Sequence, residues 1–267
     1  MNTYNRIKSI LICIPILLLT NCNIKERLEA TPMPTIIEKP PELLWRDAQR
    51  YLRNKDFPQA ATTFEEIDKQ HPYSKLAKKG QMMSAYVHYL ANDYVNSIFS
   101  INRFISLYPA DVKNMPYMLY LKGLCYYEQI NSVVLDQNPT LKAKDTYTEL
   151  LNRYPNSNYS KDAKKKMVLI NDQLAAQEMN VGRYYQKKNK HLAAIKRFKT
   201  VVDNYNTTAQ IPEALYRLTE SYLSLGILEE AKKTTSVLGY NYKTSSWYKL
   251  SYKLLEKHRY KQNGKQS

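Results

Sequence analysis

The side chains that could carry out catalysis are scattered along this chain. No HExxH, CxxC or GxSxG motif occurs, so the sequence has neither zinc ligands at a usual spacing nor the serine of a hydrolase turn. Cys125 is expected to be a small buried residue rather than a nucleophile. Carboxylates are expected at solvated helix positions, and His88 and His191 inside the fold. The four histidines occupy separate repeats: His71, His88, His191 and His258. We predict no enzyme, no metal site and no cofactor.

The low glycine content excludes the two common glycine-rich loops that bind dinucleotides and nucleoside phosphates. The 267 residues include only 6 glycines, and no GxGxxG or GxxxxGK[ST] can be written, so nucleotide-binding glycine loops are absent. Forty basic residues against 24 acidic ones give a formal charge of +16. Such a charge favours binding to a nucleic acid, to an anionic membrane surface or to an acidic protein partner.

The N-terminus combines basic and apolar residues as a targeting signal does. Arg6 and Lys8 precede the uncharged stretch Ile10–Leu19, which is too short to span a bilayer. The following Leu19-Thr20-Asn21-Cys22 looks like a bacterial lipobox, although Asn21 is atypical. This resemblance predicts a signal peptide over 1–21 and lipidation of Cys22. The alternatives are an uncleaved anchor, or an ordinary signal peptide followed by a chance cysteine.

A lipobox implies a chain held at a membrane by several acyl groups, which together anchor a protein stably. Asn23, rather than an aspartate, follows the cysteine, which implies sorting to the outer membrane. Removal of the signal peptide lowers the formal charge from +16 to +14 and leaves Cys125 as the only unmodified cysteine. Residues 22–41 are polar with four prolines and are expected to form a flexible tether.

The remaining chain is repetitive. Small residues recur as reference points at Ala60, Ser97, Ala143, Ala194 and Ala231. In the first unit, Phe64 and Ile67 follow four and seven positions later, Ala48 precedes by twelve, and Pro72 follows by twelve. Small residues allow two helices to cross closely, residues at +4 and +7 share one helix face, and the proline ends the second helix. The pattern resembles the tetratricopeptide (TPR) repeat, and we predict an all-α fold, an α-solenoid of five TPR-like helix-turn-helix repeats over 42–260.

Three irregularities accompany this pattern. An insertion is expected within Glu128–Lys142, and a longer second helix, Ser160–Asn180, is expected between units three and four. A capping helix is predicted over Tyr240–Tyr260, and 261–267 form a basic tail. One face of the capping helix should carry Trp247, Leu250, Leu254 and Leu255.

Three local strings add a family resemblance. Asn102–Pro109, Tyr117–Leu124 and above all Asn152–Ala163 resemble the BamD family, lipoproteins of the outer-membrane β-barrel assembly machinery. The resemblance extends over roughly Glu42–Trp247. It departs at Asn206, where the unit-four proline is missing, at the atypical lipobox and in the basic tail.

First helices of TPR arrays line the concave face, which places aromatic and thioether side chains in a groove of the N-terminal half. The family resemblance implies that this groove binds the C-terminal targeting segment of unfolded outer-membrane proteins, which ends in an aromatic residue. Arg46, Arg50, Arg53 and Lys79 could meet its carboxylate. The predicted groove residues are Trp45, Gln49, Arg53, Met82, Tyr86, Tyr89, Tyr117, Tyr120 and Tyr127, with Leu124 beside them; packing between repeats is the alternative for each tyrosine.

The resemblance also implies a docking surface for the barrel subunit, which has periplasmic repeat domains. We expect it at Lys196, Arg197 and Lys199, although a solvated helix face is the alternative. Other assembly lipoproteins, unfolded outer-membrane proteins and, through acylated Cys22, outer-membrane lipid are the further expected partners. The implied location is the periplasmic face of the outer membrane, where no nucleic-acid duplex is available. An alternative function is a cell-envelope TPR scaffold for peptidoglycan or division proteins.

Overall fold

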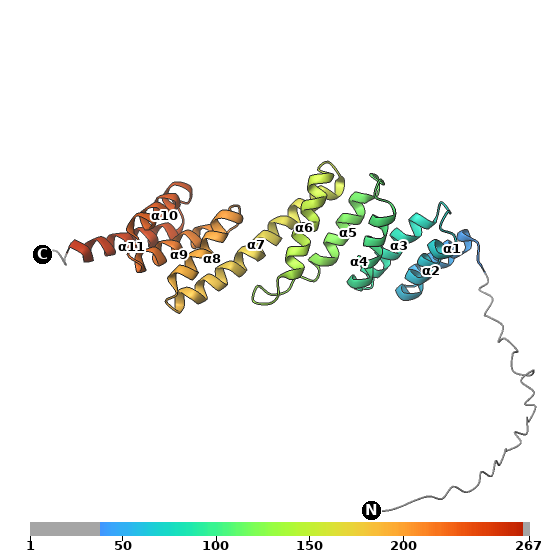
Figure 1. Ribbon diagram of the computed structural model, residues 1–267, viewed down its shortest axis with the longest axis horizontal. Coiled ribbons are helices and arrows are strands. Elements are labelled where there is room, and N and C mark those ends of the chain that lie inside the picture. The colour runs from blue at the N-terminus through green and yellow to red at the C-terminus, as the bar shows by residue number, and fades with distance from the viewer. Residues whose placement is uncertain (1–37, 264–267) are drawn as a thin grey trace, which may run out of the picture. The chain divides into compact units, whose positions relative to one another are not determined.

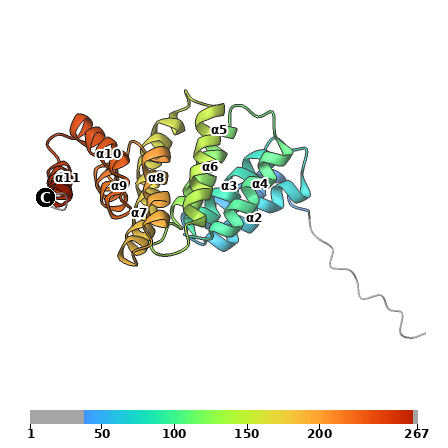
Figure 2. The same ribbon diagram turned by 60° about the vertical axis from the view of Figure 1, so that its left-hand side comes forward.

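The computed structural model describes residues 38–263 and consists there entirely of helices and their connections. The all-α solenoid prediction is confirmed. The helices are α1 (Pro41–Arg53), α2 (Phe57–Gln70), α3 (Ala77–Leu90), α4 (Tyr94–Leu107), α5 (Met115–Tyr127), α6 (Asn138–Arg153), α7 (Asn158–Lys187), α8 (His191–Asn204), α9 (Ile211–Ser224), α10 (Leu228–Asn241) and α11 (Ser246–Asn263). Within the array they pack as successive antiparallel hairpins (Figures 1 and 2).

Local signals in the sequence explain where the hairpins turn. Asp56 and Asp93 cap α2 and α4 by accepting a hydrogen bond from the backbone N–H three residues on. Just before each of these caps, Lys55 and Asn92 adopt positive φ angles of 60° and 58°. Asn189 in unit four and Gly226 in unit five also adopt positive φ angles just before the second helix of their unit, of 57° and 73°. A left-handed residue therefore closes the turn between the two helices in four of the five units.

Contacts between small and aromatic residues hold the two helices of a unit together. A Cβ built on Gly123 would lie 2.3 Å from the Tyr147 ring, and one on Gly182 would lie 2.4 Å from the Phe198 ring. Both rings are fully buried. The +4 positions of the repeat thus pack directly onto the small residues of the preceding helix, as the spacing predicted.

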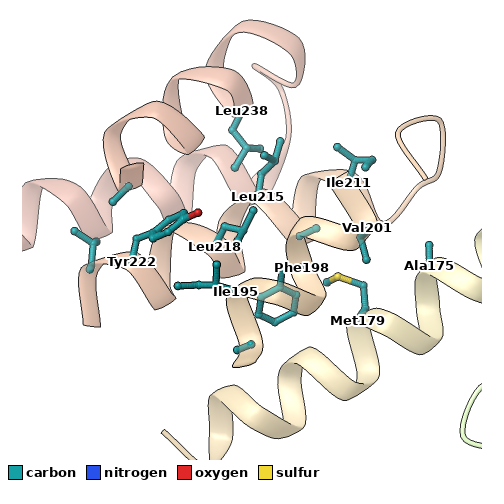
Figure 3. Packing of buried hydrophobic residues seen from close by; sticks show 14 residues of the cluster. Ala175, Met179, Ile195, Phe198, Val201, Ile211, Leu215, Leu218, Tyr222 and Leu238 are labelled. Carbon is teal, nitrogen blue, oxygen red and sulfur yellow. The ribbon is translucent and has the colours of Figure 1, made fainter. Parts of the chain in front are cut away.

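The core follows the array as four buried clusters in chain order. The largest joins α7 to α11 and contains Met179, Phe198, Leu218 and Leu238 (Figure 3). The others lie in α1–α3, in α3–α5 and in α5–α7. Each helix pair therefore buries its apolar face against its neighbours, as a solenoid requires.

Helix α7 differs from its prediction. The expected second helix Ser160–Asn180 is instead part of one 30-residue helix, which is the first helix of unit four extended at its N-terminus. No proline or glycine interrupts the chain from Asn158 to Val181, so nothing ends the helix there. The break at 154–157 occurs where the repeat pattern indicated, and the insertion forms the loop 128–137.

The C-terminal helix also needs correction. It begins at Ser246 rather than Tyr240 and runs to Asn263, into the predicted tail. Trp247, Leu254 and Leu255 pack against the last cluster, but Leu250 is 45% exposed. The predicted signal peptide, Cys22, most of the tether and residues 264–267 lie outside the described residues. Among residues 38–263, no helix has both the length and the apolar character needed to cross a membrane.

Candidate functional site

A hollow on the first-helix side of the N-terminal half is the main candidate site. It has a volume of about 450 Å³ and receives side chains from α1, α3, α5 and α7 and from the turn before α5. Its lining is Trp45, Lys79, Met82, Met83, Lys113, Asn114, Tyr117 and Tyr159. Most of this lining is aromatic or thioether, which suits apolar and aromatic groups of a bound polypeptide.

An aromatic cluster holds the α5–α7 side of the hollow. The ring centroids of Tyr117 and Tyr159 lie 5.5 Å apart, and those of Tyr120 and Tyr159 lie 5.3 Å apart. Across the hollow, Trp45 packs edge-on against buried Phe64 at 5.2 Å. Because these rings rest on core residues, the aromatic surface is preformed rather than assembled on binding.

The charged groups around the hollow have one sign. Lys79 and Lys113 contribute ammonium groups, and the lining contains no carboxylate. Neither lysine forms an ion pair with any carboxylate among residues 38–263. Asp111, the acidic residue of the preceding turn, is engaged by Lys78 at 2.9 Å and by the Asn114 amide at 2.8 Å. The site therefore favours an anionic group beside an apolar one.

The structure brings together only part of the predicted groove. Trp45, Met82 and Tyr117 line the hollow, with Lys79 from the predicted cationic rim. Tyr86, Tyr89 and Leu124 pack against the α3–α5 cluster, as Met82 and Tyr117 also do, but they do not line the hollow. Other predicted residues lie outside the lining, namely Gln49, Arg46, Arg53, Tyr120, Tyr127 and Arg50, which pairs with Asp47 at 3.1 Å.

The extended start of α7 explains the positions of two tyrosines. Tyr120 donates a hydrogen bond to the Asp162 carboxylate at 2.6 Å, and Lys166 lies over the Tyr127 ring at 4.6 Å. Both contacts come from the first turns of α7, which cover this part of α5. Burial, followed by the hydrogen bond to Asp162, raises the pKa of Tyr120 above its usual value.

Four lining residues were missed by the sequence analysis: Met83, Lys113, Asn114 and Tyr159. Tyr159 lies in the first turn of α7, which the five-unit alignment does not include. It is nevertheless inside Asn152–Ala163, the string that carried the family resemblance. That string could have indicated the residue.

The second predicted surface lies on α8. Lys196 and Lys199 are exposed and line a shallow depression that also includes strongly exposed Leu192. Arg197 points elsewhere, because its guanidinium pairs with Glu178 of α7 at 3.1 Å. The three residues therefore share a helix, but only the two lysines share the depression.

The candidate catalytic side chains have structural positions. Cys125 is fully buried, donates to Ser97 Oγ at 3.2 Å, and has its pKa raised by burial to about 11. His88 lies between two carboxylates, with Nε2 3.3 Å from Glu65 and Nδ1 3.2 Å from Asp93. Within residues 38–263, no group of three or more histidine, cysteine or acidic side chains could hold a metal ion.

One carboxylate contradicts the expectation that all of them are solvated. Asp68 on α2 is buried and accepts a hydrogen bond from Arg103 of α4 at 2.6 Å. The pair joins the second helices of the first two units. A buried charge is tolerated there because the guanidinium compensates it.

Comparison with known proteins identifies the family. A family model described as YfiO, an outer membrane lipoprotein, matches residues 37–238. The outer membrane protein assembly factor BamD of Caulobacter vibrioides is 43% identical over 224 residues, covering 83% of this chain and 73% of that protein. BamD of Rickettsia prowazekii is 43% identical over 220 residues, covering 82% and 87%. BamD of Neisseria meningitidis serogroup A is 32% identical over 214 residues, covering 76% and 80%. The chain therefore belongs to the BamD family.

Proposed function

We propose that this chain is an outer membrane protein assembly factor that binds the C-terminal segments of unfolded outer-membrane proteins in the hollow of its N-terminal half. Family membership supports the general role. The single observation that carries the binding role is the aromatic and thioether hollow with lysines and no carboxylate at its lining.

The chemistry of such a segment matches the hollow in two ways. An aromatic side chain at the end of a polypeptide would pack among Trp45, Tyr117 and Tyr159 at low entropic cost. The terminal carboxylate would then lie within reach of Lys79 or Lys113, whose ammonium groups have no competing acid in the described chain. Binding involves only these contacts, and no bond is made or broken.

The aromatic part of the site can be tested with a matched pair of tyrosines on α7. Tyr159 lines the hollow, whereas Tyr184, 60% exposed on the same helix, does not. We expect Tyr159→Ala to weaken binding of a barrel-derived peptide with a C-terminal aromatic residue by roughly tenfold, about 1.4 kcal/mol. Tyr184→Ala should leave the dissociation constant unchanged. Equal affinities of both variants in a fluorescence titration would exclude this hollow.

The cationic part requires a comparison of two peptides. We expect a Lys79→Gln, Lys113→Gln variant to bind the peptide with a free C-terminal carboxylate more weakly, and to lose most of the preference for it over the amidated form. The control, Lys164→Gln with Lys165→Gln, changes the same charge on exposed α7 positions outside the hollow. A preference that survives in the hollow variant would mean that the lysines do not read the carboxylate.

A second interaction is proposed for α8. Lys196 and Lys199 would dock on an acidic surface of the barrel subunit. Leu192, near the start of α8, would add an apolar contact beside them. Charge reversal of both lysines should reduce recovery of a large barrel protein with periplasmic repeats from solubilised outer membranes. Arg197→Leu would also break the ion pair between Arg197 and Glu178. Glu178→Gln breaks the same ion pair but leaves the arginine in place, so it serves as the control.

Anchoring through an acylated Cys22 would hold this adaptor at the periplasmic face of the outer membrane. Other assembly lipoproteins would be recovered in the same complex. Cys22→Ser should prevent incorporation of labelled palmitate in cells. Incorporation that persists would place the lipid on another residue.

A further inference from the structure

One edge of the first two repeats has a surface chemistry that α8 does not use and that the hollow shares only at Lys113 and Asn114. The loops that join one repeat to the next lie along one edge of the array, the upper edge in Figure 1. We call residues 71–76 and 108–114, the first two of these loops, the loop edge. They are neighbours, since Lys78 at the start of α3 pairs with Asp111 of the second loop at 2.9 Å.

The loop edge exposes apolar side chains at its tips. Tyr73 is 101% exposed and lies at the tip of a turn closed by the hydrogen bond from Ser74 N–H to His71 C=O, 2.9 Å. Val112 is 67% exposed in the second loop, which a 3.0 Å bond from Asp111 N–H to Tyr108 C=O closes. Single exposed apolar residues are common, but here a tyrosine and a valine occupy the tips of two neighbouring loops.

Basic residues accompany these tips without acidic neutralisation. Lys75 and Lys113 are exposed and form no ion pair among residues 38–263, and the one acid of the two loops, Asp111, is already engaged by Lys78. The loops at 154–157 and 205–210 lack this combination, since their exposed residues are Pro155, Asn156, Asn206, Thr207 and Ala209. A tyrosine with lysines and an aliphatic residue is the composition that favours the boundary between lipid head groups and acyl chains.

The chain enters the array beside this edge. Lys39 donates its backbone N–H to Gln70 at 3.3 Å, and its carbonyl lies 2.6 Å from the His71 ring, at the base of the Tyr73 turn. About 17 residues separate Lys39 from Cys22, a reach of up to roughly 60 Å. An anchor with that reach does not orient the array, so an orienting contact has to come from the array itself.

We propose that the loop edge lies on anionic lipid head groups, with Tyr73 and Val112 inserted at the interface and Lys75 near the phosphates, while Lys113 belongs to the hollow. This orientation rests on the proposed anchoring at Cys22. Lysines near an anionic surface and partial burial of small apolar groups add cooperatively to a nearby acyl anchor. The mouth of the hollow would then be held at a defined height relative to the membrane.

The test uses the mature chain with Cys22→Ser, so that no acyl group contributes. The probes are vesicles of phosphatidylethanolamine with phosphatidylglycerol, and vesicles of phosphatidylcholine alone. We expect co-sedimentation with the anionic vesicles only, and a loss of at least about tenfold in partitioning for Tyr73→Ser, Lys75→Glu, Val112→Ser. The control makes corresponding changes at the turn between α7 and α8, on the opposite edge of the array: Tyr184→Ser, Lys188→Glu and Leu192→Ser. Those residues are also exposed, Tyr184 to 60% and Leu192 to 72%.

A second measurement locates the contact. An environment-sensitive dye on Tyr73→Cys should shift to the blue with anionic vesicles, whereas the same dye on Tyr184→Cys should not; native Cys125 is buried. Equal partitioning of the loop variant and the unsubstituted chain, or equal dye shifts at both positions, would overturn the proposal. The loop variant should bind the C-terminal peptide as well as the unsubstituted chain does, since none of its three residues lines the hollow. Failure of the unsubstituted chain to bind the peptide would count against the hollow and not against the loop edge.

Discussion

Gly182 shows how little space a single residue has where the two helices of a unit cross. An added Cβ would meet the Phe198 ring at 2.4 and 2.8 Å, and that ring is fully buried, so the two helices or the ring would have to shift. Overpacking of this kind costs about 1–3 kcal/mol, partly offset by the better helix propensity of alanine, up to about 1 kcal/mol. We therefore predict that Gly182→Ala lowers the free energy of unfolding by roughly 1 kcal/mol in urea titrations.

A double-mutant cycle shows whether the clash with the Phe198 ring is the reason that Gly182→Ala destabilises the protein. In a Phe198→Leu background the clashing ring is absent, so the added methyl group should cost less than it does in the unsubstituted chain. If Gly182→Ala destabilises both backgrounds equally, the contact with the ring is not the reason.

His88 is the residue whose protonation should be visible in the stability of the protein. The hydrogen bond to Glu65 raises the pKa of His88 against the opposing effect of burial, and Asp93 raises it further, whereas Lys69 lies beside the same Glu65. A raised folded-state pKa means that His88 contributes stability fully below about pH 6.5 and loses it as the pH rises through the higher folded-state value. The group is partly exposed, so the loss is at most about 1 kcal/mol.

The measurement compares the melting temperature at pH 6 and pH 8 for the unsubstituted chain and for His88→Gln. We expect the unsubstituted chain to lose roughly 2–4 °C over this interval. The variant should change less, since glutamine can hydrogen-bond but does not titrate. Parallel pH curves for the two proteins would show that other groups cause the dependence.

Residue-level predictions succeeded where the side chain is small and apolar. Cys125, expected to be a small buried residue, is buried because its helix position faces the α3–α5 cluster. Asp68 was not predictable in this way. Its burial depends on Arg103, 35 residues away in sequence, and no local pattern shows that the two meet.

At the scale of elements, α11 is held by a buried group of hydroxyls. Thr235 stands where the other units place Phe64, Ile101, Tyr147 or Phe198, and it hydrogen-bonds Ser251 Oγ at 2.8 Å. Thr219 lies 3.1 Å from the same serine oxygen, and both Thr219 and Ser251 are fully buried. We predict that Ser251→Ala destabilises the protein by about 1–2 kcal/mol, since two buried hydroxyls lose a partner.

Ser236→Ala provides the control for this prediction. Its hydroxyl also forms a hydrogen bond, to the Lys232 carbonyl of the same helix, but it is exposed. Calorimetry should show a change within about 0.5 kcal/mol for the control. A Ser251→Ala protein as stable as the control would mean that the hydroxyl group does not hold α11.

Helix positions followed from the repeat spacing except where that spacing changes. From Ala60 to Ser97 and from Ala194 to Ala231 the units have the same length, and α1–α4 and α8–α10 lie where the offsets place them. Between Ala143 and Ala194 the chain contains extra residues. Periodicity shows that these residues are helical but not to which neighbouring helix they belong. In the structure they belong to α7, which is uninterrupted from Asn158 to Lys187 and packs along α5.

The same limit applies to the candidate site. Trp45, Met82 and Tyr117 were predictable because they face inward from the first helices of regular units. Tyr120 and Tyr127 occupy equivalent positions, but the added turns of α7 cover them. The composition of the hollow could therefore be predicted from the sequence, whereas its boundary could not, because the boundary depends on the length of one irregular helix.

For the whole molecule, the separation of the core into four successive clusters predicts uneven stability along the chain. Phe198→Ala removes a fully buried ring from the cluster that joins α7 to α11, at a cost of about 3–5 kcal/mol. In a solenoid each unit contacts only its neighbours, so the loss should be concentrated in the C-terminal units. We predict that hydrogen exchange accelerates strongly in α8–α11 and little in α1–α4, and that the variant still binds the C-terminal peptide in its N-terminal hollow. Phe64→Ala is the matched substitution in the first cluster and should give the opposite distribution, with peptide binding reduced. Uniform acceleration along the chain in both variants would mean that the array unfolds as one cooperative unit, in spite of its linear architecture.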